Sequence, residues 1–135
     1  MQVKLALLAD GANVSREGKL NLFGIFDTLF ARTFPTTHPQ MQLVLRFEAA
    51  PHEGGSTRPM EIQLVAEDGR VLFRLPGTLG VGQRGLADTI RMDHILTLNH
   101  VQFERPGHYH FDVLVDGQKA AAVPLQVEQV ATAAH

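Results

Sequence analysis

Apolar and polar residues alternate along several short segments of the chain. The most regular segment runs from His108 to Val115, between the turn signals Pro106-Gly107 and Asp116-Gly117. Its apolar residues fall on every second position: Tyr109, Phe111, Val113 and Val115. A period of two places neighbouring side chains on opposite faces of an extended strand. The pattern therefore predicts a strand with one buried face.

The first half of the chain shows the same pattern. Residues 41–49 alternate cleanly, and residues 2–10 predict a first strand that is apolar on both sides. Asp10-Gly11-Ala12-Asn13 predicts a loop, because Asp and Asn side chains close local turns. The apolar positions of 19–29 change parity near Gly24, which predicts a bulge or a bend there.

Proline and glycine mark the breaks between these strands. Because proline cannot donate to a central ladder, Pro35 and Pro39 predict a segment that crosses between sheets or lies at an edge. Residues 50–59 and 76–85 are rich in Gly and Pro and predict loops. Residues 88–103 do not keep one period, so we expect a strand that is broken near Asn99-His100.

Two hairpins can be given a register from their turns. Asp68-Gly69 favours a two-residue type I′ turn, which pairs Leu64 with Phe73 and Val65 with Leu72. A two-residue turn at Asp116-Gly117 would instead place the bulky residues of 123–127 on the polar face of the preceding strand. We therefore predict a three-residue loop there, with Gly117 in the left-handed conformation.

Seven to nine short strands with turns between them predict an all-β fold, a two-sheet antiparallel β-sandwich of the immunoglobulin-like type. The length of 135 residues suits a single domain, here residues 1–128. Residues 129–135 are small and polar, and we expect them to fray as a C-terminal tail.

Composition excludes several classes of function. The formal net charge is -2 and the Lys and Arg residues are scattered, so nucleic acid and anionic membranes are not expected partners. The absence of cysteine rules out disulfides, thiolate zinc sites and a cysteine nucleophile. The apolar run at the start ends at Asp10 and fits a strand better than a signal peptide, so we expect a cytoplasmic protein.

Most of the chain resembles a known family. The N-terminal part of the resemblance is the more specific. The residues that carry the resemblance are Leu8-Ala9-Asp10, Asn13-Val14, Glu17-Gly18-Lys19-Leu20-Asn21, Gly24-Ile25-Phe26-Asp27, His38-Pro39, 43–48, Pro106-Gly107, Tyr109, Phe111, Val115-Asp116-Gly117 and Val123-Pro124-Leu125. On these residues the chain is similar to a family of small bacterial single-domain proteins catalogued as a domain of unknown function. The resemblance implies a β-sandwich without an established activity, and it carries over no functional residue.

One strand face carries a candidate metal site. His108, His110 and Asp112 occupy alternate positions, so their side chains share one face of the predicted strand about 6.5–7 Å apart. Two histidines and a carboxylate, with His94 or His100 as a further ligand, can hold a metal ion. The competing interpretation, which we favour, is the polar outer face of an amphipathic strand. A pH-sensitive surface is a third interpretation.

Three further motifs are assigned structural roles. Gly80-Val81-Gly82-Gln83-Arg84-Gly85 matches the dinucleotide pattern G-x-G-x-x-G, but no strand–helix unit surrounds it, so we expect a loop. Loop residues at one end of the sandwich could gather oxygens for calcium, or simply cap turns: Asp10, Asn13, Arg16, Glu17 and Asp27. Ser15 lacks the G-x-S-x-G context of a nucleophile.

These observations favour a non-enzymatic protein that acts through protein–protein contact or self-assembly, as a homo-oligomer or with a protein partner. Sandwich edges offer unpaired backbone groups, and four apolar residues fall on predicted outer faces: Val44, Val65, Leu72 and Leu114. The alternative is a metal- or small-ligand-binding protein that uses the histidine face or the end loops. No cofactor is expected.

Overall fold

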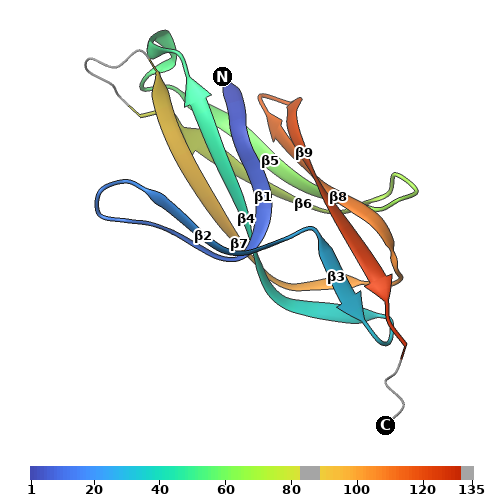
Figure 1. Ribbon diagram of the computed structural model, residues 1–135. Helices are drawn as coiled ribbons and strands as arrows, with labels where there is room; N and C mark the ends of the chain where they lie inside the picture. Colours follow the sequence, from blue (N-terminus) through green and yellow to red (C-terminus); the bar gives the residue numbers. More distant parts are fainter. Residues whose placement is uncertain (83–88, 132–135) are drawn as a thin grey trace.

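The arrangement of the strands is taken from a computed structural model, which describes residues 1–82 and 89–131. Within these residues nine strands form two sheets, as the alternation predicts (Figure 1). The strands are β1 (Gln2–Val14), β2 (Leu20–Phe26), β3 (Thr28–Ala31), β4 (Thr36–Ala49), β5 (Thr57–Val65), β6 (Val71–Gly80), β7 (Ile90–Phe103), β8 (Gly107–Val115) and β9 (Gln118–Gln129). A short 3-10 turn, η1 (Pro51–Glu53), precedes β5.

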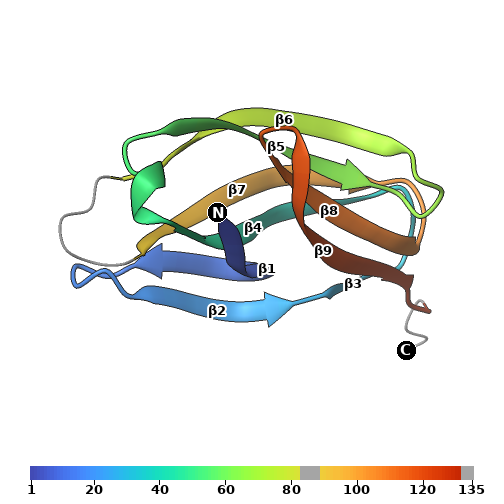
Figure 2. The same ribbon diagram turned by 90° about the horizontal axis from the view of Figure 1, so that it is seen from above.

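The two sheets pack face to face as a β-sandwich (Figure 2). The four-stranded sheet has the order β2-β1-β4-β7, and the five-stranded sheet has the order β3-β9-β8-β5-β6. Neighbouring strands are antiparallel except β3 and β9, which are parallel. The expectation of a wholly antiparallel sandwich is therefore wrong at this one pair. The chain passes from β2 into the second sheet as β3, and β3 runs in the same direction as its neighbour β9.

The core lies between the inward faces of the two sheets. β4 supplies Met41, Leu43, Leu45 and Phe47, which are fully buried. The alternating residues of β8 lie on the same core, and Phe103 packs edge-on against Tyr109 with ring centroids 5.0 Å apart. The face predicted for the segment 108–115 is confirmed.

The predicted lengths of both hairpin loops are wrong: the first loop is one residue longer than predicted, and the second is one residue shorter. The first hairpin has a three-residue loop: the N–H of Ala66 donates to the carbonyl of Arg70 at 2.8 Å, and Gly69 has φ 89°. A register shift beside Leu64 then restores the predicted pairing of Leu64 with Phe73. The second hairpin has a two-residue turn, since Val115 pairs with Gln118 across Asp116-Gly117.

The second hairpin nevertheless keeps the face predicted for it. A register shift between Val113 and Leu114 inserts Ala120 as an extra residue, so Val113 pairs with Ala121 and Phe111 with Val123. A bulge of one residue reverses the side on which all later side chains lie. It therefore lets a two-residue turn coexist with the burial of Val123, Leu125 and Val127.

Several segments predicted as loops are strands. Residues 10–13 continue β1, and residues 76–80 continue β6. At Gly24 the register of β1 with β2 is constant, so the feature there is a local bend at φ 68° and not a bulge. β7 is continuous, but His100 has φ 54°, and the buried positions change parity there from Leu98 to Val101.

The edges of the domain differ little from expectation. The segment 32–35 crosses from the five-stranded to the four-stranded sheet, as Pro35 predicts, whereas Pro39 lies within β4, in a part that pairs with β7 and not with β1. β9 extends to Gln129, and the amide of Val130 donates to the carbonyl of Ala31 at 2.9 Å, so the predicted frayed tail does not begin at residue 129. Residues 132–135 of that tail lie outside the described residues. In the part of the chain that is described, no helix is long and apolar enough to cross a membrane.

Candidate functional site

The three predicted metal ligands lie on β8 as expected, and two of them, His110 and Asp112, contact each other. The backbone N–H of His108 donates to Glu67 Oε1 at 3.1 Å. His110 Nε2 lies 3.3 Å from Asp112 Oδ1, and the ammonium of Lys119 lies 3.0 Å from the same oxygen. Within residues 1–82 and 89–131 no three His, Asp or Glu side chains gather in a metal-binding arrangement. The face therefore carries one ion pair that links β8 to β9.

The predicted end-loop residues are spread along the β1–β2 hairpin and beyond it. Asp10 lies opposite Gly24, where a Cβ on the glycine would collide with the Asp10 carboxylate. The amide of Asn21 donates to Asn13 Oδ1 at 2.9 Å, and Asp27 Oδ1 accepts from the Thr28 hydroxyl at 2.9 Å. These contacts are those of cross-strand pairing and turn capping. Of the glycine motif, Gly80 ends β6, and residues 83–85 lie outside the described residues.

The apolar residues predicted for outer faces are covered by their neighbours. Val44 is fully buried between Leu7 and Ile95, its partners in the adjoining strands, and Val65 is also buried. Leu72 and Leu114 are half-buried. These four residues therefore form no exposed patch.

Exposed apolar residues gather instead on a hairpin arm, which we define as residues 10–25. The ladder between β1 and β4 ends where Ala9 pairs with Gln42, whereas β1 and β2 remain paired out to Val14 and Leu20. The arm therefore extends beyond the four-stranded sheet as a two-stranded ribbon (Figure 1). An isolated two-stranded hairpin is marginally stable in water.

Both faces of the hairpin arm are apolar. One face presents Phe23 and Ile25, which are 58% and 60% exposed. The ring of Phe23 lies across Gly11, its partner on β1, where any side chain would collide with the ring. The other face carries Val14, which is exposed, and Leu22. The sequence prediction missed the arm because residues 10–13 were assigned to a loop.

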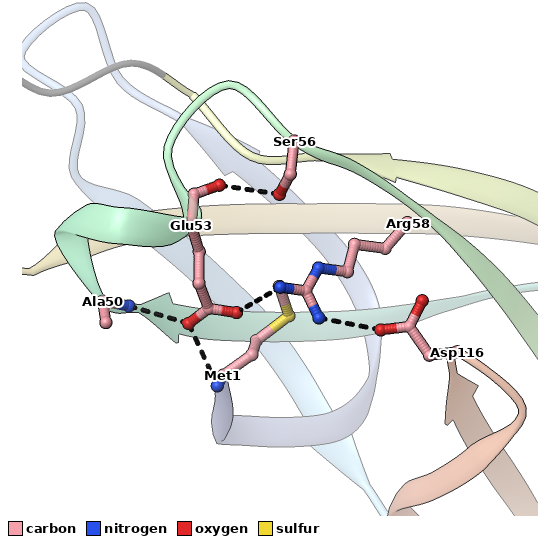
Figure 3. Close-up of polar contacts among 6 residues, drawn as sticks. All are labelled: Met1, Ala50, Glu53, Ser56, Arg58 and Asp116. Carbon is pink, nitrogen blue, oxygen red and sulfur yellow. Dashed lines mark hydrogen bonds and ion pairs between the residues drawn. The ribbon is translucent and has the colours of Figure 1, made fainter.

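A second cluster, also not predicted, surrounds the buried carboxylate of Glu53 at the end of η1 (Figure 3). Its Oε1 accepts from the backbone N–H of Ala50 at 2.9 Å and lies 3.2 Å from the amino group of Met1. Its Oε2 lies 2.7 Å from Nη2 of Arg58, whose Nη1 reaches Asp116 Oδ2 at 2.8 Å. The cluster ties η1, β5 and the β8–β9 turn together.

Hydrogen bonding and charge set the ionisation of this cluster. The N–H of Ala50 lowers the pKa of Glu53, against the effect of burial, and the nearby positive charges lower it further. Both oxygens of the carboxylate and both terminal nitrogens of the Arg58 guanidinium face protein partners. The arrangement suits a structural clamp, since both oxygens of the buried Glu53 carboxylate are occupied by protein partners.

A groove of about 810 Å³ opens at the opposite edge of the four-stranded sheet, between β6 and β7. Its lining combines apolar side chains from both strands with polar ones, and charged residues lie at one end. Concave sites of roughly 300–1,000 Å³ that join apolar surface with a few polar groups are typical of small-molecule binding. The lining residues come from segments far apart in the sequence, and no motif marks the groove.

Comparison with solved structures finds similarity at low sequence identity. The alkylpurine DNA glycosylase AlkC of Pseudomonas fluorescens, solved bound to DNA containing an abasic site analog, is 7% identical with a TM-score of 0.51. A glycosyl hydrolase family 2 member from Bacteroides cellulosilyticus is 13% identical with a TM-score of 0.38 over 70% of this chain. The first match covers 94% of this chain but only 30% of the glycosylase chain, and the second match covers only 14% of the hydrolase chain. At this identity the first likeness shows the fold alone.

Together these features define a two-sheet β-sandwich domain with nine described strands and a projecting hairpin arm. Comparison with curated proteins gives no match. The chain belongs to DUF6941, a family of unknown function, whose model matches residues 4–128. The resemblance seen in the sequence is thereby confirmed.

Proposed function

We propose that the protein acts through protein–protein contact, and that the hairpin arm joins two copies of the chain. The observation that carries this proposal is the outer edge of β2. It is a free strand edge of seven residues, five of them large and apolar, without proline or charge. Unprotected edges of this kind pair readily with another strand.

The other free edges of the described sheets are less suited to pairing. β6 carries Pro76, which lacks a backbone donor. β7 carries the charged side chains of Arg91 and Asp93. β3 has only four residues. Natural sheets protect their edges by such means, so the unprotected β2 is the edge that we expect to be covered in the assembled protein.

Charge complementarity favours a second copy as the partner. Lys19 precedes β2 and Asp27 follows it, and both are exposed. If two β2 strands pair in antiparallel fashion about a twofold axis at Phe23, Lys19 of each copy lies opposite Asp27 of the other. A twofold interface requires this kind of self-complementarity. The pairing would also cover Phe23 and Ile25.

The experiment is sedimentation velocity of the full chain, with mass checked by light scattering. We expect twice the chain mass of 14.8 kDa for the unmodified protein. Ile25→Lys places two like charges in the interface and should weaken association by roughly tenfold or more. Phe30→Lys is the matched control, because Phe30 is 63% exposed on the short edge strand β3 and should leave the dimer intact.

A charge exchange separates a second copy from any other partner. Lys19→Asp alone and Asp27→Lys alone should each weaken the dimer, and the double variant should restore it, because the opposed charges are then merely exchanged. A monomeric unmodified protein would contradict the proposal. So would equal effects of Ile25→Lys and Phe30→Lys.

A further inference from the structure

A cavity of about 320 Å³ opens on the side of the sandwich where β2 ends and β3 begins. β2 and β3 are the outermost described strands on this side (Figure 2). The ladder of β1 with β2 ends where Leu8 pairs with Phe26, and the ladder of β9 with β3 begins only at Gln126. Between these two ladders neither sheet has an outer strand in the described chain, and the cavity lies there.

The cavity is lined mainly by apolar side chains. Leu8 and Val123, from the two facing sheets, are buried, and Phe26 is half-buried beside them. Ala6, which is also half-buried, contributes only a methyl group. Asp27 adds an exposed carboxylate to the lining. The cavity therefore suits an apolar side chain that has a cation as its neighbour.

The hairpin arm carries this combination near its tip. Leu20 is half-buried, and Lys19, directly before it, is exposed. Because the register of β1 with β2 is constant, Leu20 and Phe26 fall on the same face of β2. Leu20 cannot reach the cavity of its own chain, since its partner Val14 lies eight positions along β1 from Ala6, which is about 26 Å.

A second copy can bring Leu20 to the cavity. Opposed residues of an antiparallel pair lie on the same face of the sheet. When two β2 strands pair about a twofold axis at Phe23, Leu20 of one copy lies opposite Phe26 of the other, and Lys19 lies opposite Asp27. Phe26 and Asp27 both line the cavity, so the tip of one arm lies over the cavity of the other copy.

The charges select this register over its neighbours. An axis at Leu22 would place Lys19 opposite the apolar side chain of Ile25, and an axis at Gly24 would place it opposite Leu29, which belongs to β3. An axis between two residues would oppose side chains from different faces, which an antiparallel ladder does not allow. The register that pairs the opposite charges is therefore also the one that brings Leu20 to Phe26.

We infer, from the pairing of two β2 strands proposed above, that the cavity is the receptor for Leu20 of the second copy, with Lys19 of that copy paired to Asp27 at the rim. Twofold symmetry makes the contact reciprocal, so each arm fills the cavity of the other chain. The leucine side chain leaves water for an apolar site, which favours association. The extension of the arm beyond its own sheet is what lets its tip reach the other copy.

An exchange of side-chain size between arm and cavity tests this contact. Leu20→Ala should weaken the dimer about tenfold or more, because the leucine side chain no longer fills the cavity. Ala6→Phe fills the cavity from within and should weaken the dimer similarly, and the double variant should recover most of the lost affinity. Val14→Ala is the matched control: it removes apolar atoms from the same face of the arm, away from the β2 edge, and should leave the dimer unchanged.

Sedimentation velocity over a concentration series measures these affinities, and thiol cross-linking gives an independent test. The chain has no cysteine, so introduced cysteines are unique. The variant with both Ala6→Cys and Leu20→Cys should give a covalent dimer with a bismaleimide whose spacer spans about half of the 26 Å within one chain. Neither single variant should do so, because the two copies of Leu20 lie six positions apart across the axis, roughly 20 Å.

The outcomes separate this inference from the β2 pairing. A dimer that forms in the unmodified protein but keeps its affinity in Leu20→Ala and in Ala6→Phe would overturn the assignment of the cavity and leave the pairing in place. Absence of a covalent dimer in the double cysteine variant, or its formation by a single one, would overturn the assignment as well. A monomeric unmodified protein would overturn both the assignment and the pairing.

Discussion

At the scale of single residues, the buried carboxylate of Glu53 is the feature with the largest expected consequence. It is the one charged residue in the described part of the chain that is buried. Its oxygens satisfy the N–H of Ala50 and the guanidinium of Arg58, groups that otherwise would lose partners away from water. The clamp thus holds η1 against β5 and the β8–β9 turn.

We expect Glu53→Gln to lower the free energy of unfolding by about 2 kcal/mol at neutral pH, since a buried amide cannot satisfy both partners. Urea denaturation measures this. Because the pKa of Glu53 is lowered in the folded protein, its stabilisation is present above the ordinary value of 4.5 and is lost as pH falls below it. The loss of stability at acid pH should therefore be smaller in Glu53→Gln than in the unmodified protein. Glu17→Gln, at an exposed position, is the control and should keep the full loss.

His94 gives a second pH dependence, at higher pH. Burial lowers the pKa of His94, which is half-buried on the inward side of β7 between Met92 and Leu96. The unfolded chain then binds a proton more readily, so stability is full above pH 6.5 and declines as pH falls through the lowered folded value.

Replacing His94 by leucine should remove this decline. Thermal melts at pH 7.5 and pH 5 should differ less for His94→Leu than for the unmodified protein. His52→Gln, a change at an exposed histidine on η1, is the control and should retain the full difference. An unchanged difference in His94→Leu would show that the acid sensitivity arises elsewhere.

At the scale of the elements, alternation predicts strands well and turns poorly. A period of two reports which face of a strand is buried, and this held for β4 and β8 because each packs one face on the core. Loop length does not follow from this pattern. One extra residue within a strand, a bulge, lets the loop length change while the same face of the strand stays buried. The shifts beside Leu64 and Val113 are such insertions, and neither has a signal in the local sequence.

The β8–β9 turn provides a test at this scale. Gly117 has φ 76°, a left-handed conformation that costs residues with a Cβ roughly 1–2 kcal/mol. We expect Gly117→Ala to lower the free energy of unfolding by about that amount in chemical denaturation. Gly80→Ala is the matched control, because Gly80 is also exposed but lacks a positive φ and has open space around its Cβ position. Equal losses would contradict the assignment of the two-residue turn.

At the scale of the whole molecule, the two-layer architecture follows from the sequence, but the surfaces with functional interest do not. The groove requires β6 and β7 to face each other across the sandwich, and the ion pair of Arg58 with Asp116 joins segments far apart in the chain. Such contacts leave no local pattern. The histidine face shows the reverse case: its strand and face were predicted correctly, but Lys119 of β9 contacts the Asp112 carboxylate.

The parallel pairing of β3 with β9 has a consequence for synthesis of the protein. β3 leaves the ribosome early, yet its ladder partners, Gln126 to Gln129, are among the last residues of β9 to be made. The four-stranded sheet and the β5–β6 hairpin can assemble while translation continues, whereas the five-stranded sheet gains its outer strand only after β9 emerges. Throughout that interval the nascent chain carries β3 unpaired, with the apolar ring of Phe30 beside an open strand edge, the kind of surface that chaperones shield.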